Sequence, residues 1–169
     1  MDKRWIFILI IIVIACACGY LIVNSSTTVG SAIADVSKST VTLPHSYSVK
    51  DSTNEDIIIT NKKNMHEEIY IKDIGKEDFA LKEFKADFKK LSSDGSVDEL
   101  KNTSNTTEDY KLYNAYYKNG SDYMSVSYLY KNEHTYLIKA TGYSDIDNLI
   151  EKVNFVADTI KPDYKKSQD

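Results

Sequence analysis

Disulfide-forming cysteine is missing from most of this 169-residue chain. The two cysteines, Cys16 and Cys18, both lie in one apolar run near the N-terminus. On a helix, residues two apart face different directions, so these two cannot bridge each other. Residues 24–169 must therefore be stable through their core alone, and we interpret the cysteines as small apolar side chains.

Motifs that carry chemistry are missing as well. The three histidines, His45, His66 and His134, stand alone, without the spacing that places two imidazoles on one metal ion. No G-x-S-x-G elbow, Walker loop or G-x-G-x-x-G is present. The acidic clusters 51–56 and 94–99 lack EF-hand spacing, and we interpret them as turns. We expect no catalytic activity, cofactor or bound metal. The alternative is a hydrolase or metal-dependent enzyme whose site assembles from scattered residues.

An excess of positive charge is also absent. The chain has 21 basic and 25 acidic residues and a formal net charge of −4. Such a balance disfavours a nucleic-acid partner, which needs a basic surface to neutralise phosphates.

One long apolar run is present, from Trp5 to Val23, and it contains no charged residue. At 1.5 Å per residue it spans roughly 28 Å, close to the thickness of a bilayer core. Lys3 and Arg4 precede it, and the next charge is Asp35. The positive-inside rule then predicts a single-pass anchor in the cell membrane, with a cytoplasmic N-terminus and the rest of the chain outside.

Two other interpretations of this run are cleavage by signal peptidase after Ala32-Ile33-Ala34 and lipidation at Cys16. The anchor is favoured because the run exceeds the usual length of a signal-peptide core and Ala34 lies far beyond Val23. Ala15 and Gly19 have a small-xxx-small spacing, which predicts at most a weak homodimer through the anchor.

The remaining chain divides by composition. Residues 24–40 are rich in Ser and Thr and predict a flexible spacer, residues 41–162 predict one folded domain, and residues 163–169 form a polar tail. Within the domain, strands are expected at 41–49, 56–61, 67–74, 110–117, 122–131 and 134–141. Helical periodicity predicts helices at 77–91 and 145–160, and the polar stretch 97–109 is expected to be a loop. This order, β-β-β-α-β-β-β-α, predicts an α+β fold in which two helices flank an antiparallel sheet of about six strands.

The order of elements resembles the PsbP-like (Mog1/PsbP) domain family over about residues 41–161. The resemblance includes the opening Leu43-Pro44-His45-Ser46-Tyr47, the aromatic-rich strands and a last helix ending in VADTIK. In that family a start like Phe-x-x-Pro-x-Gly-Trp is common; here Tyr47 replaces the tryptophan and the glycine is absent. The resemblance implies scaffold, assembly or binding roles without shared catalytic residues.

Two sets of residues are candidates for surface roles. Nine of the thirteen tyrosines lie between Tyr110 and Tyr143, and Tyr113, Tyr117 and Tyr123 are expected to form a partner surface opposite Met124 and Val126. The sequons at Asn102 and Asn105 are the candidate glycosylation sites. The sequence thus predicts a membrane-anchored, extracytoplasmic, non-catalytic domain that binds a protein or a component of the cell envelope.

Overall fold

The computed structural model describes residues 32–108 and 110–162. Neither helix within these ranges is long and apolar enough to cross a membrane. The predicted anchor, its cysteines and its small-xxx-small pair lie outside the described residues, as does the tail. The elements are β1 (Ile33–Val36), β2 (Ser39–Thr42), β3 (Tyr47–Ser52), β4 (Asp56–Asn61), β5 (Glu68–Gly75), α2 (Ala80–Ser93), β6 (Asp98–Thr106), β7 (Tyr110–Asn119), β8 (Asp122–Lys131), β9 (His134–Tyr143), α3 (Ile146–Thr159) and β10 (Lys161–Pro162).

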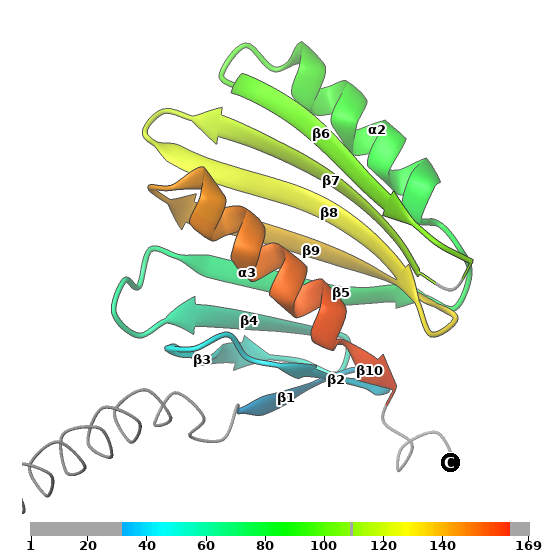
Figure 1. Ribbon diagram of the computed structural model, residues 1–169. Helices are drawn as coiled ribbons and strands as arrows, with labels where there is room; N and C mark the ends of the chain where they lie inside the picture. The colour runs from blue at the N-terminus through cyan, green and yellow to red at the C-terminus, as the bar shows by residue number, and fades with distance from the viewer. Residues whose placement is uncertain (1–31, 109, 163–169) are drawn as a thin grey trace, which may run out of the picture. The chain divides into compact units, whose positions relative to one another are not determined.

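The centre of the fold is a seven-stranded antiparallel sheet in the order β3-β4-β5-β9-β8-β7-β6 (Figure 1). The strands from β7 to β9 form an antiparallel meander, joined by the two-residue loops Gly120–Ser121 and Asn132–Glu133. Asn132 and Glu133 both have positive φ, as a type I′ hairpin turn requires. A second sheet of three short strands has the order β1-β2-β10.

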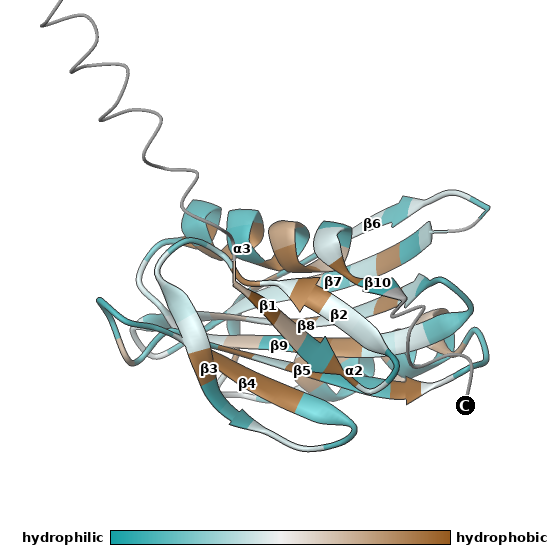
Figure 2. Ribbon diagram, turned by 90° about the horizontal axis from the view of Figure 1, so that it is seen from below, coloured by the Kyte–Doolittle hydropathy of each residue, from teal (hydrophilic) through white to brown (hydrophobic). Residues whose placement is uncertain are grey.

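Both faces of the large sheet are covered, with α3 on one and α2 on the other (Figures 1 and 2). On the α3 side, residues of the small sheet and of α3 join the main core, which includes Val41, Tyr143 and Val153. On the α2 side the cluster is smaller and is built around Ala80, Val126 and Tyr128. Strand β8 is therefore buried on both faces, at every residue from Ser125 to Leu129.

The two helices differ in how deeply they are buried. Helix α3 buries Leu149, Val153, Val156 and Ala157. Helix α2 buries only Ala80, while its phenylalanines remain half-exposed. Burial of apolar area is what stabilises a helix on a sheet, so α3 is the main support of the fold and α2 is peripheral.

The prediction of an α+β fold with an antiparallel sheet and two helices is confirmed, with three local corrections. Residues 98–106 form a strand, β6, where a loop was expected, and this adds the seventh strand. The expected spacer contains β1 and part of β2, so folded structure begins before residue 41. The stretch 41–49 is divided between two sheets by a turn at Pro44, where the Tyr47 N–H donates to the Pro44 carbonyl at 3.0 Å.

Candidate functional site

Strand β6 is one end of the large sheet, because β7 is its only partner among the described strands. Eight of its nine residues are exposed and Leu100 is half-buried. Helix α2 packs on β7 and β8, and α3 packs on β8, β9 and β2, so β6 extends beyond the strands that carry the helices (Figure 1). Its outward N–H and C=O groups are available to another strand.

The usable part of this strand is the segment 101–106, which we name the β6 edge. It pairs without a shift against residues 116–111 of β7, whereas a register shift separates Asp98 from Lys101. Glu99 within this shift has a φ of 51°. At about 3.3 Å per residue the β6 edge is roughly 20 Å long. Lys101 is its one charged residue, and Figure 2 shows β6 as mainly hydrophilic.

Strand β3, the opposite end of the sheet, is a poorer edge for pairing. Its register shifts in the middle of the strand, between Val49 and Asp51. Lys50 lies at the shift and forms an ion pair with Glu68 on β5. Bulges and charged side chains are the features that keep edge strands from pairing with other chains. The two ends of the sheet therefore differ, and the β6 edge is the one suited to strand addition.

Both predicted glycosylation sites, Asn102 and Asn105, lie on the β6 edge and are exposed. They are strand residues rather than loop residues, and they alternate to opposite faces because their separation is odd. Their modification stays a prediction. A glycan on either residue would stand beside the unpaired edge and obstruct a second strand.

The three candidate tyrosines do not share a face. Tyr113 and Tyr117 pack against the cluster under α2, whereas Tyr123 packs against the main core on the α3 side. Tyr113 is the cross-strand partner of Tyr128, and such partners point to the same face of a sheet. The expectation that these tyrosines lie opposite Val126 is therefore wrong for Tyr113 and Tyr117. All three are half-buried, and their role in partner binding stays a prediction.

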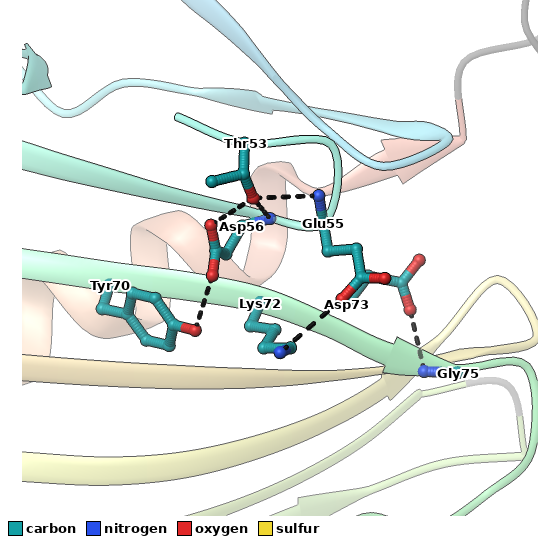
Figure 3. Close-up of polar contacts among 7 residues, drawn as sticks. All are labelled: Thr53, Glu55, Asp56, Tyr70, Lys72, Asp73 and Gly75. Carbon is teal, nitrogen blue, oxygen red and sulfur yellow. Dashed lines mark hydrogen bonds and ion pairs between the residues drawn. The ribbon is translucent and has the colours of Figure 1, made fainter. Parts of the chain in front are cut away.

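Tyrosines elsewhere in the domain hold carboxylates at the margins of the core. The hydroxyl–carboxylate distances are 3.1 Å for Tyr47–Glu67, 2.9 Å for Tyr70–Asp56, 3.2 Å for Tyr110–Asp158 and 2.7 Å for Tyr128–Asp87. Burial, reinforced by the hydrogen bond to Asp56, raises the pKa of Tyr70 to about 12. Hydrogen bonds from Thr53 and Tyr70 lower the pKa of Asp56 (Figure 3). A tyrosine whose ring is packed and whose hydroxyl is hydrogen-bonded stabilises the fold, so we assign these tyrosines a structural role.

The surface that best fits the enzyme alternative is an open pocket of about 430 Å³ at the end of β5. We name it the His134 pocket. It brings His134 together with Asp73, Glu55 and the turn between β1 and β2. His134 Nδ1 lies 2.8 Å from Asp73 Oδ2, an arrangement that resembles the oriented base of a catalytic dyad. His134 and Asp73 are 61 positions apart in the sequence, so no local pattern predicts this pair.

The carboxylates of the His134 pocket already have partners. The other oxygen of Asp73 accepts a hydrogen bond from the Gly75 N–H at 3.0 Å, across the bulge of β5 (Figure 3). Glu55 pairs with Lys72 at 3.6 Å and its side chain is 71% exposed. Asp73 therefore joins the β5 bulge to the start of β9, and the contacts of the pocket fit a structural role.

Metal-binding chemistry finds no support in the described part of the chain. Within residues 32–108 and 110–162, no three His, Cys, Asp or Glu side chains are grouped so that they could hold an ion. His45 and His66 are exposed.

Comparisons with known proteins support the fold. No protein-family model matches the chain, and no curated protein matches its sequence. Among solved structures it is similar to the solution structure of cyanobacterial PsbP (CyanoP) from Synechocystis sp. PCC 6803. The identity is 12%, the TM-score is 0.53, and the match covers 80% of this chain and 95% of that chain. Since the same fold hosts different functions, the likeness specifies no ligand. The domain has a PsbP-like fold.

Proposed function

We propose that this chain is a membrane-anchored, extracytoplasmic domain that binds a partner protein without catalysis, and that an extended segment of the partner pairs with the β6 edge. The observation that carries this proposal is the long, exposed and unpaired β6 edge at the end of an otherwise covered sheet. The anchor and the location rest on the apolar run from Trp5 to Val23 behind Lys3 and Arg4.

Strand addition follows from the chemistry of the β6 edge. In an antiparallel pair, alternate residues direct their main-chain groups to one side, so roughly half of the six residues are available to a new strand. These hydrogen bonds provide affinity, and side chains at alternate positions provide specificity. Asn102, Thr103, Ser104, Asn105 and Thr106 carry no charge, so they favour a partner segment that is extended and uncharged.

The test uses the full-length protein in native membranes. It compares the wild type with a variant whose β6 edge carries added lysines, because charged side chains on an edge strand disfavour pairing with a second strand. Asn102→Lys combined with Thr106→Lys places two charges on one face of the β6 edge. The control is Ser48→Lys combined with Ser52→Lys on β3, the other end of the sheet. We expect the β6 variant to fold and to lose the cross-linked partners of the wild type, while the β3 variant retains them. If the β6 variant folds and recovers the same partners, the β6 edge is not the binding site.

The anchor has its own test. Protease added to intact cells should degrade the domain and leave the N-terminal segment protected by the membrane. A mature N-terminus at Cys16, Ile33 or Asp35, determined by protein sequencing, would show that the run is lipidated or removed.

The His134 pocket favours one other candidate function, a hydrolase that uses His134 as a base oriented by Asp73. Loss of a hydrolytic activity in His134→Gln, with an unchanged unfolding temperature, would support the enzyme. Loss of stability alone would identify the pair as structural. The binding proposal is preferred because the Asp73 carboxylate already holds the bulge of β5.

A further inference from the structure

The molecule has another polar pocket, of about 270 Å³, between α3 and the strands β6 and β7. We name it the α3–β6 pocket. Asn154 and Asp158 contribute from α3, one helical turn apart, and Asn105, Tyr110 and Asn114 contribute from the β6–β7 side. The pocket lies on the α3-facing side of β6, whereas the proposed strand addition uses the outer edge of β6. The two sites can therefore be tested separately.

A buried asparagine in this pocket has an unused hydrogen-bonding atom. Asn114 is 3% exposed, and its Nδ2 donates to Thr103 Oγ1 at 3.2 Å. Its Oδ1 accepts no hydrogen bond from any described residue. Exchanging the amide oxygen and nitrogen would leave the nitrogen unpaired instead. A buried polar atom without a partner destabilises a fold, and a leucine of similar shape would avoid that cost.

The chemistry around Asn114 selects one class of ligand. Three side-chain amides, Asn105, Asn114 and Asn154, line the pocket together with the hydroxyl of Thr103. Asp158 is the one charged side chain of the lining, and the Tyr110 hydroxyl lies 3.2 Å from its Oδ1. No lysine or arginine lines the pocket, and the neighbouring Lys131 directs its ammonium to the carbonyls of Ala157 and Asp158, so the lining itself favours a neutral ligand. Amides and a carboxylate beside an aromatic ring match a ligand with many hydroxyl groups and apolar ring faces.

We propose that the α3–β6 pocket binds a saccharide ring. The ring hydroxyls donate to Asn114 Oδ1, which becomes accessible to the ring when α3 and β6 separate, and exchange further hydrogen bonds with Asn154 and Asp158. At about 270 Å³ the pocket lies just below the usual size range of sites for drug-sized ligands, so it accommodates a single ring and no more.

The experiment uses the full-length protein in lipid nanodiscs and the probes glucose, N-acetylglucosamine and cellobiose, with ethanolamine as a competing class. Nuclear magnetic resonance of the asparagine side-chain amides reports binding. We expect saturable shifts of the Asn114 and Asn154 signals with at least one sugar. Saturation by ethanolamine but by none of the sugars would overturn the ligand class, and the absence of saturable shifts with any probe would overturn the site.

Three variants separate the proposed role of Asn114 from a structural one. Asn114→Leu should weaken sugar binding by about tenfold or more while its unfolding temperature stays the same or rises. Asn154→Ala, on the exposed side of α3, should weaken binding without affecting the fold, and it decides the question if Asn114→Leu does not fold. Asn148→Ala, on α3 but outside the pocket lining, is the matched control for Asn154→Ala and should bind sugar as the wild type does. Undiminished binding in Asn154→Ala, or in a folded Asn114→Leu, would overturn the proposal.

Discussion

Gly142, near the end of β9, is the position where we expect a single methyl group to be most damaging. Its φ is +79°, and a Cβ placed there would lie 1.9 Å from the carbonyl oxygen of His66 and 2.5 Å from its carbonyl carbon. These are backbone atoms of the loop between β4 and β5. Since ordinary contacts of a Cβ begin near 3.4 Å, Gly142→Ala forces this loop to move by more than 1 Å.

The displaced loop carries a network around Glu67, which is 6% exposed. Glu67 accepts hydrogen bonds from Asn61 at 2.7 Å, from Asn64 at 3.0 Å and from Tyr47 at 3.1 Å. Hydrogen bonds to a charged group contribute about 1.5–3 kcal/mol each. The left-handed conformation of a non-glycine residue adds about 1–2 kcal/mol. Loss of one such bond together with this strain predicts a cost of about 3–5 kcal/mol, a large part of a typical free energy of unfolding.

Two other glycines serve as controls in chemical denaturation measurements. Gly120 also has a positive φ, +61°, but nothing lies within 4 Å of a Cβ added there, so Gly120→Ala isolates the backbone strain. Gly95 has neither feature, and Gly95→Ala should be neutral or slightly stabilising. If Gly142→Ala costs no more than Gly120→Ala, the close approach of β9 to the β4–β5 loop does not constrain the fold.

Two further predictions concern charge. Lys131 on β8 is half-buried and donates to the carbonyls of Ala157 and Asp158 at the end of α3, which has no basic residue in its last turn. Lys131→Met should lower the free energy of unfolding by about 1–2 kcal/mol in urea denaturation, and an equal loss in the surface variant Lys90→Met would contradict this role. Burial raises the pKa of Tyr116 and Tyr136 from 10.0 to about 12, so the folded state holds these protons more tightly than the unfolded state. The resulting stability is fully present below pH 10 and should be lost between about pH 10 and 12; a pH-independent denaturation midpoint across that range would refute the prediction.

The sequence by itself determined the elements whose signal is local. The apolar stripe from Ile146 to Ile160 predicts α3, and the short polar joins at Gly120 and Asn132 predict the hairpins of the meander, because periodicity and turn chemistry act over a few residues. At the start of α3, Ser144 and Asp147 have the spacing of a capping box, but the side chain that accepts the hydrogen bond from the Asp147 N–H is that of Asp145.

The remaining features of the fold and of the candidate sites depend on tertiary structure. Strand β6 has no apolar alternation, because neither of its faces is buried, and its pairing with β7 is what makes it a strand. The opposite directions of Tyr113 and Tyr123 are set by the register of β7 on β8, which pairs Tyr113 with Tyr128. Both are half-buried because the two faces of the sheet are covered, which the sequence pattern of a single strand does not reveal. His134 meets Asp73 only because β5 and β9 are neighbours in the sheet. Asn114 shares a pocket with Asn154 and Asp158 only because α3 packs back across the sheet. Contacts between distant segments depend on how whole helices and strands pack together, so local sequence patterns do not predict them.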